Sequence, residues 1–133
     1  MGAVVVDTHA LVWYLMEPDR LSQPASDAFD QAAATGAAIY VSAISLVEII
    51  YLVDRWRLPQ SVWDRLMEEL AAPEAEISVV AVDQNVAVSV QAISRATVND
   101  MPDRIIAATA LRLNLPLVTR DRKIQAAQVQ CIW

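Results

Sequence analysis

The apolar positions fall into short continuous runs that alternate with helix-length segments along the chain. Each run is rich in valine and isoleucine and shows no polar alternation, which predicts strands covered on both faces. The expected strands are residues 3–6, 38–41, 77–82, 116–119 and 129–133. Between them the pattern predicts helices at about residues 8–16, 24–34, 43–56, 61–71, 84–95, 102–113 and 122–127.

This alternating order predicts an α/β fold in a single domain over residues 1–133. Its centre would be a parallel sheet of about five strands flanked by helices, because right-handed crossovers place helices on the two faces. The carboxyl ends of such strands form the edge where these sheets bind ligands. A chain of 133 residues, with 56% hydrophobic positions and two glycines, is long and apolar enough to bury this core.

Four isolated acidic residues stand beside the apolar stretches. Asp7 directly follows the first expected strand, and Asp121 follows the fourth. Glu48 lies in the second turn of the helix after the second strand, and Asp103 lies in the first turn of the helix that leads to the fourth. Removing a carboxylate from water is unfavourable unless a partner compensates its charge. If the fold gathers these four acids at one edge, divalent cations are the natural compensation.

Helix capping is an alternative explanation for most of these acids. Asp7 and Asp121 each precede an expected helix. Asp100 precedes the helix at residues 102–113, and Asp103 lies in its first turn, where an acid complements the helix dipole. Capping is the better interpretation of Asp100, whereas capping and metal binding are equally supported for the other three.

Glu48 has no comparable structural explanation. It lies beyond the first turn of a helix whose neighbouring residues are apolar, and Ser45 is on the same face three residues earlier. A partly buried polar pocket accounts for this pair better than a solvated surface does. We therefore expect Glu48 to be functional.

Mg²⁺ and Mn²⁺ fit this set of groups because they prefer oxygen ligands and keep several waters. Two such ions about 3.5–4 Å apart can activate a water and stabilise the leaving oxygen in phosphodiester cleavage. The sequence has no phosphate-binding glycine loop and no Gly-x-Ser-x-Gly motif. His9, the single histidine, is in an apolar segment and is interpreted as structural. The tryptophans could stack on bases, but their positions favour core or subunit contacts: Trp13, Trp56, Trp63 and Trp133.

Charge and cysteine content limit the cellular context. The formal net charge of −6 argues against nucleic-acid binding by charge alone. The segment from Arg104 to the end is an exception, because it contains five basic residues and only one acidic residue. The only cysteine, Cys131, excludes an internal disulfide. The start lacks the features of a secretory signal. Residues 37–53 are apolar, but Ser42, Ser45 and Glu48 interrupt them, so a buried strand and helix fit better than a membrane span. We expect a soluble, cytoplasmic protein with no membrane partner.

Four segments, each around one of the acids, resemble the motifs of the PIN-domain ribonucleases, and within them the VapC toxins of toxin–antitoxin pairs. They are residues 5–13, 41–49, 102–110 and 117–121. Each motif is weak alone, but all four in this order and at these separations form a specific pattern over essentially the whole chain. Met101 is a departure, because many relatives place proline directly after the acid that corresponds to Asp100. The role of Asp100 is therefore open.

The resemblance implies a PIN-like domain with an acidic catalytic pocket that holds Mg²⁺ or Mn²⁺. The acids of that pocket, carried over position by position, are Asp7, Glu48, Asp103 and Asp121. The residues implied to contact these acids or the waters of the metal are Thr8, Ser45 and Thr119. The resemblance further implies RNA as the substrate, a homodimer, and a VapB-like antitoxin whose tail blocks the pocket.

The function predicted from these features is a metal-dependent endoribonuclease that acts as the toxin of a VapBC-type system. Candidate contacts to the RNA backbone, which a solvated surface explains equally well, are Arg104, Arg120, Arg122 and Lys123. One alternative is a PIN-like nuclease in RNA maturation or DNA cleavage, and an adjacent antitoxin gene would argue against it. Another is a non-catalytic protein-binding module, for which Glu48→Gln would leave metal affinity unchanged.

Overall fold

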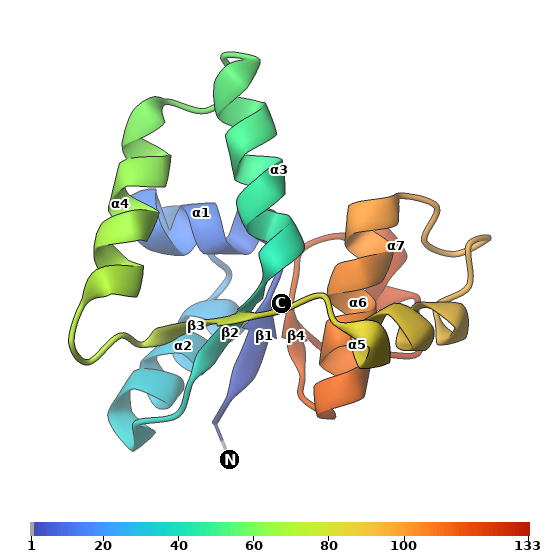
Figure 1. Ribbon diagram of the computed structural model, residues 1–133. Helices are drawn as coiled ribbons and strands as arrows, with labels where there is room; N and C mark the ends of the chain where they lie inside the picture. Colours follow the sequence, from blue (N-terminus) through green and yellow to red (C-terminus); the bar gives the residue numbers. More distant parts are fainter. Residues whose placement is uncertain (1) are drawn as a thin grey trace.

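The computed structural model describes residues 2–133 and contains a five-stranded parallel sheet (Figure 1). The strand order is β3-β2-β1-β4-β5, and every neighbouring pair is parallel. The strands are β1 (Val4–Val6), β2 (Ile39–Ser42), β3 (Ile77–Val80), β4 (Leu117–Val118) and β5 (Cys131–Ile132). The α/β class and the parallel sheet predicted from the sequence are confirmed, and several strands are shorter than expected.

Helices occupy the connections between the strands. They are α1 (Thr8–Met16), α2 (Gln23–Thr35), α3 (Ala43–Asp54), α4 (Gln60–Ala71), α5 (Gln84–Ser89), α6 (Met101–Leu113) and α7 (Arg122–Gln125). Two 3₁₀ turns are also present, η1 (Pro18–Arg20) and η2 (Val90–Ala92). Within residues 2–133, none of these helices has both the length and the apolar character that crossing a membrane requires.

The helix expected over residues 84–95 is wrong beyond Ser89, where the chain tightens into η2. The guanidinium of Arg104, on α6, donates hydrogen bonds of 2.8–3.1 Å to the carbonyl oxygens of Val90 and Ile93. These carbonyls therefore have partners without a continuing helix, which removes the need for further helical turns.

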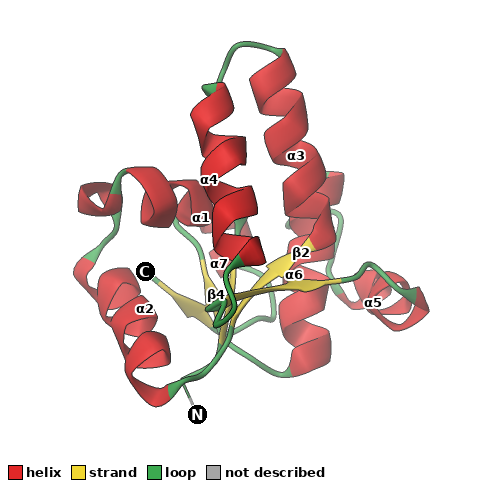
Figure 2. Cartoon of the chain, turned by 60° about the vertical axis from the view of Figure 1, so that its left-hand side comes forward, coloured by secondary structure: helices red, strands yellow, loops and turns green. Residues whose placement is uncertain are grey.

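The sheet has a hydrophobic core on each face. Val4 and Val6 point into the core that includes α1, α2 and α4, whereas Val5 points into the core formed with α6 and α7. Successive residues of a strand alternate between faces, so a continuous valine run serves both cores. Figure 2 shows the helices on both faces of the sheet.

Helices begin just beyond the carboxyl ends of the central strands. Asp7 caps α1, Ser42 caps α3 and Asp121 caps α7, each through a side-chain oxygen that accepts a backbone N–H. The α3–α4 hairpin rises from this edge and projects beyond the sheet (Figure 1). The carboxyl edge therefore brings together helix starts, polar caps and a projecting hairpin.

Candidate active site

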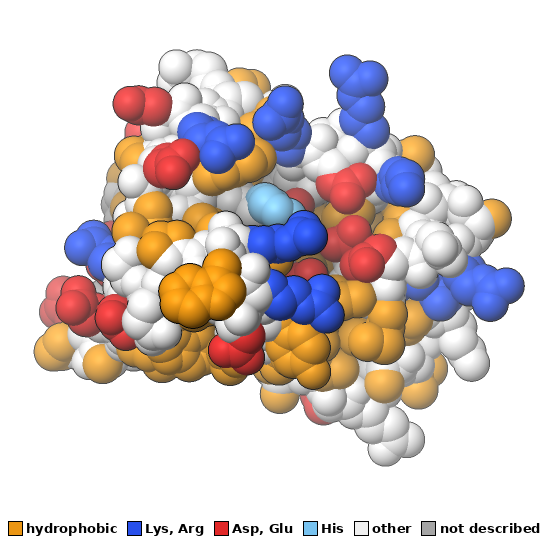
Figure 3. Space-filling model, turned by 90° about the horizontal axis from the view of Figure 1, so that it is seen from above, with side chains coloured by type: hydrophobic (Ala, Val, Ile, Leu, Met, Phe, Trp, Pro, Cys, Tyr) orange, Lys and Arg blue, Asp and Glu red, His pale blue; other side chains and the backbone are white. Residues whose placement is uncertain are grey.

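A pocket of about 440 Å³ lies at the carboxyl edge of the sheet, between the first turns of α1 and α6 and the second turn of α3. Four of its lining residues are the acids singled out from the sequence, Asp7, Glu48, Asp103 and Asp121. The remaining lining residues are Thr8, His9, Trp13, Asp100 and Arg120. Figure 3 shows acidic side chains gathered beside the histidine on this face of the molecule. The fold thus joins four acids that are far apart in the sequence.

Capping and pocket lining are combined in the same side chains. Asp7 Oδ1 accepts a hydrogen bond of 2.9 Å from the backbone N–H of Ala10, and Asp121 Oδ1 accepts one of 2.8 Å from that of Lys123. A cap occupies one oxygen of a carboxylate and fixes the direction of the other. The two interpretations of these acids are therefore compatible, since the cap orients a group that also lines the pocket.

Asp100 and Asp103 are joined at the start of α6. Asp100 Oδ2 accepts a hydrogen bond of 3.0 Å from the backbone N–H of Asp103, so the capping expected for Asp100 is confirmed. Asp100 also lines the pocket, and its charge acts on Asp103 and Glu48. The sequence favoured capping for Asp100 and left any further role open, and the structure shows that it is a fifth acidic side chain lining the pocket.

Thr119 lies behind the pocket and connects two of the acids. Its fully buried hydroxyl donates a short hydrogen bond to Asp7 Oδ2 and accepts one of 3.0 Å from the backbone N–H of Asp121. It therefore ties the end of β1 to the loop after β4. With Ala10 on one oxygen and Thr119 on the other, Asp7 is held in a single orientation.

Replacing Thr119 with valine is expected to lower the free energy of unfolding by about 2 kcal/mol, because a buried carboxylate oxygen loses its donor. Urea denaturation measures this change. Thr109→Val is the matched control, since the buried Thr109 hydroxyl donates to Ile105 O within its own helix and orients no acid. Equal losses in the two variants would mean that the bond to Asp7 contributes nothing specific.

Glu48 is held by a second pair of hydroxyls. Thr8 Oγ1 donates a hydrogen bond of 2.6 Å to Glu48 Oε1. Ser45 Oγ lies 2.9 Å from Thr8 Oγ1 and donates to it, because the single proton of Thr8 is already engaged with Glu48. Ser45 and Glu48 thus lie on one helical face, as their spacing predicted, and this face contacts Thr8 at the start of α1.

Burial raises the pKa of three acids in this pocket, Asp7, Glu48 and Asp103. Loss of solvation is the main cause of a raised pKa at Asp7 and at Glu48, opposed in part by the hydrogen bonds from Thr119 and Thr8. The pKa of Asp103 rises to about 7, first through burial and then through the charges of Asp100 and Asp121. The pocket therefore gathers acidic groups, and among residues 2–133 none of them forms an ion pair with a basic side chain.

The donor set of the pocket fits a hard divalent cation. It consists of carboxylates and hydroxyls, and no sulfur or buried imidazole is present among its lining residues. Within residues 2–133, no three acidic, histidine or cysteine side chains are close enough to form a complete ligand cluster. Mg²⁺ suits such an open arrangement, since it is usually held by one or two carboxylates and keeps several waters.

Two pocket residues have positions that the sequence did not reveal. His9 was interpreted as structural, but its side chain is exposed and lines the pocket, 6.0 Å from the Trp13 ring between centroids. Trp13 is buried, as expected, but one side of it also reaches the pocket. The signal that would have identified His9 is its position as the second residue of a helix that begins directly after a strand, at the carboxyl edge of the sheet.

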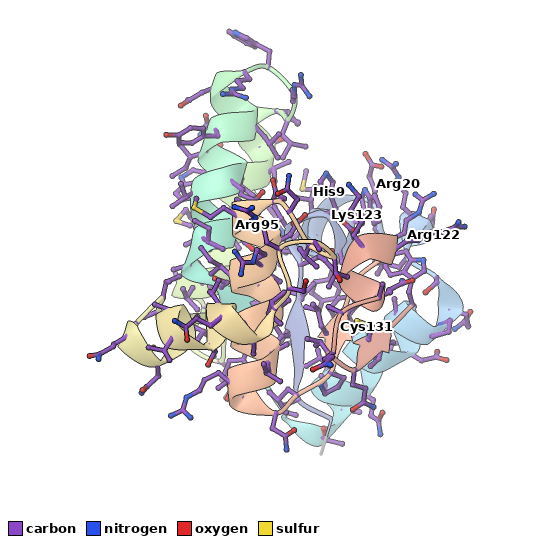
Figure 4. All side chains as sticks on the ribbon, turned by 90° about the vertical axis from the view of Figure 1, so that its right-hand side faces the viewer. His9, Arg20, Arg95, Arg122, Lys123 and Cys131 are labelled. Atoms are coloured by element: carbon purple, nitrogen blue, oxygen red, sulfur yellow. The ribbon has the colours of Figure 1, made fainter. Side chains whose placement is uncertain are left out.

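The basic candidates divide into two groups. Arg120 is exposed and lines the pocket, and its guanidinium carbon lies 5.9 Å from the centroid of the Trp13 ring. Arg122 and Lys123 are exposed on α7, on the same side of the molecule as His9 and Arg20 (Figure 4). Arg20, which the sequence did not single out, also lies over the Trp13 ring at 4.7 Å. Arg104 instead binds backbone carbonyls, so its contact with RNA stays a prediction that no geometry supports.

Comparison with known proteins gives the family. The PIN domain family model matches residues 4–129 of the chain. The chain belongs to the PIN-domain family. This PIN domain is 30% identical over 126 residues to Ribonuclease VapC22 of Mycobacterium tuberculosis, an alignment that covers 95% of the chain and 92% of that relative. The resemblance read from the four acidic motifs is therefore confirmed.

Solved structures share the fold of this PIN domain. One is VapBC2 from Rickettsia felis bound to a DNA fragment from its promoter, with a TM-score of 0.73 and 16% identity over 97% of this chain and 96% of that one. Another is FitAcB from Neisseria gonorrhoeae, with a TM-score of 0.60 and 22% identity over 96% and 95% of the two chains. At these identities the likeness concerns the fold alone.

Proposed function

We propose that this PIN domain is a metal-dependent endoribonuclease and the toxin of a VapBC-type toxin–antitoxin pair. The observation that carries the proposal is that Asp7, Glu48, Asp103 and Asp121 line one shared pocket, whose oxygen donors are the type that Mg²⁺ and Mn²⁺ prefer. The relative named Ribonuclease VapC22, matched over almost the full length of both chains, supports RNA as the substrate.

In this proposal the four acids, the two threonines that contact them and Arg120 each have a defined task. The four acids hold the metal, and Thr119 and Thr8 fix the orientation of Asp7 and Glu48 through the hydrogen bonds described above. When bound, Mg²⁺ or Mn²⁺ supplies the Lewis acidity that activates water and stabilises the leaving oxygen of a phosphodiester. Arg120, at the pocket wall, is placed to contact a phosphate of the RNA.

Further parts of the proposal concern the setting of this domain. Residues 1–133 act as one domain, consistent with the two cores that share one sheet. A VapB-like antitoxin covers the acidic pocket, and two copies of the chain form a homodimer in the cytoplasm. The VapBC2 structure from Rickettsia felis, which shares this fold, supports an antitoxin partner.

Expression of the chain alone is expected to arrest bacterial growth, and co-expression with the neighbouring antitoxin gene is expected to restore it.

Purified protein is expected to cleave RNA with Mg²⁺ and to lose this activity with EDTA, because the carboxylates alone cannot activate water. RNA cleavage that persists in EDTA would contradict metal dependence. Cleavage without any growth effect would favour an RNA-maturation nuclease over a toxin.

A further inference from the structure

Trp56 has an unusual position at the tip of the α3–α4 hairpin. Its side chain is 94% exposed, and its backbone has φ of 60°, in the left-handed region. Among residues 2–133 the only other non-glycine residue with positive φ is Asn114, a type that tolerates this region well. A bulky aromatic residue does so only at an energetic cost.

The hydrogen bonds around Trp56 explain why the backbone adopts this conformation. The N–H of Trp56 donates to Val53 O at 3.1 Å, and the N–H of Arg57 donates to Leu52 O at 2.8 Å. This pair of bonds is the Schellman motif that ends many helices, and glycine usually occupies the left-handed position. Tryptophan here is therefore less favourable than glycine by about 1 kcal/mol.

Packing within the chain does not explain this choice of residue. The neighbours Asp54, Arg55 and Arg57 are all exposed, and the chain turns inward only at Leu58, which packs against the core. Within the described part of the chain, neither Arg55 nor Arg57 forms an ion pair. The tip thus presents an exposed indole between two uncompensated guanidinium groups, in a protein whose net charge is −6.

The tip is connected to the acidic pocket along α3. A second hollow, of about 350 Å³, lies along one side of α3. Its lining is largely apolar and consists of Ile44, Val47, Glu48, Tyr51 and Leu52 of α3, Arg55 at the end of that helix, and Met101 and Pro102 at the start of α6. Glu48 lines both this hollow and the acidic pocket. Tyr51 lies midway along it with its side chain exposed, and the Arg55 guanidinium carbon is 5.9 Å from the Tyr51 ring centroid.

We infer that the exposed tip, defined as Arg55, Trp56 and Arg57, binds single-stranded RNA that extends from the acidic pocket. A base stacks on Trp56 and phosphates contact the two arginines, as in other single-strand binding surfaces that alternate aromatic and basic groups. Trp56 is eight residues after Glu48, just beyond the end of α3, and eight steps at the rise of a helix correspond to about 12 Å. That distance corresponds to about four stacked nucleotides.

The observations favour RNA over a protein partner at this tip. Tryptophans that anchor protein interfaces sit at the centre of packed apolar patches. Here the sequence neighbours of Trp56 are charged, and the residue that follows Arg57 turns into the core. The inference rests on the proposed ribonuclease function and assigns part of its substrate-binding surface.

The test uses the Asp7→Asn chain, which is expected to bind RNA without cutting it, and a single-stranded RNA of about 12 nucleotides. Adding Trp56→Gly is expected to raise the Kd about tenfold, because a stacked base is lost. The same change is expected to raise the urea midpoint, because glycine relieves the left-handed strain. Opposite effects on binding and stability distinguish RNA contact from a structural role.

The double variant Arg55→Gln with Arg57→Gln is expected to weaken binding. The slope of log Kd against log salt concentration should fall by about 1.4, the value for two lost phosphate contacts on a single strand. Trp56→Phe, which keeps an aromatic face, is expected to bind within about threefold of the parent. Arg112→Gln is a control for the loss of one positive charge elsewhere on the surface. Arg112 is exposed in the last turn of α6, at the end away from Asp103, and the Kd of this variant is expected to be unchanged.

An unchanged Kd in Trp56→Gly would overturn the inference and leave the ribonuclease proposal intact. A change of oligomeric state, or loss of antitoxin binding with RNA binding retained, would instead assign the tip to a protein interface. If the Asp7→Asn chain binds no RNA while the parent chain cuts none, both the inference and the proposed function are wrong.

Discussion

Asp7→Asn is expected to reduce RNA cleavage by about 100-fold or more, because the pocket loses a buried carboxylate that would hold the metal. The backbone position should not change, since asparagine can still accept the capping hydrogen bond from Ala10. The melting temperature without metal is expected to change little, because removing a desolvated charge stabilises the fold while losing the hydrogen bond from Thr119 opposes that gain. Cleavage of labelled RNA and thermal unfolding measure the two effects.

Asp83→Asn is the matched control for this variant. Asp83 caps α5 by accepting a hydrogen bond of 2.9 Å from the backbone N–H of Val86, but it is exposed and does not line the acidic pocket. Its replacement should leave cleavage unchanged. Equal cleavage by the parent and Asp7→Asn would show that the activity comes from another site or from a contaminant. Mg²⁺ should raise the melting temperature of the parent and not that of Asp7→Asn.

RNA cleavage and apparent Mg²⁺ affinity are expected to rise about tenfold between pH 6 and pH 8. The pKa of Asp103 is raised to about 7 in the protein without metal, so protons compete with the cation over this interval. The raised pKa values of Asp7 and Glu48 act in the same direction. Isothermal titration with Mg²⁺ at several pH values measures the effect. A flat profile would mean that these acids do not bind the metal.

The same shift has an opposite consequence for stability without metal. The folded protein favours protonated Asp103, so its contribution to stability is complete below about pH 4 and is lost as the pH rises to about 7. The parent should therefore become less stable relative to Asp103→Asn as the pH rises from 4 to 7. Mg²⁺ at pH 8 should reduce this difference. If the difference in melting temperature between the two proteins is the same at every pH, the raised pKa of Asp103 is refuted.

The strands and most of the helices could be predicted because each is specified locally. Val4–Val6 form a strand covered on both faces, and the apolar run alone indicates this. The prediction failed at residues 90–95, where Arg104 from a distant helix satisfies the carbonyls of Val90 and Ile93. A contact of this kind depends on the packing of α5 against α6, which local sequence does not encode.

The candidate site was predictable in part for the same reason. Asp7, Asp103 and Asp121 lie next to a strand end or a helix start, and Glu48 lies in the second turn of the helix after a strand, so their place at the carboxyl edge follows from the alternating order. The positions of His9 and Asp100 at the pocket were not predicted. The sequence can indicate that a residue is exposed or caps a helix, but it does not show whether that end of the helix lies beside the pocket. The strain at Trp56 was also hidden, since φ depends on how α3 ends.

The sequence by itself determined the parallel α/β architecture, the family, and the four acids as the polar exceptions within apolar segments. The tertiary structure alone decided that Thr119 and Thr8 orient these acids, that burial raises the pKa of Asp103, and that a strained tryptophan stands at the tip of the hairpin. Local patterns fix secondary structure and capping, whereas desolvation, side-chain hydrogen bonds and charge repulsion arise only when residues distant in the chain are brought together.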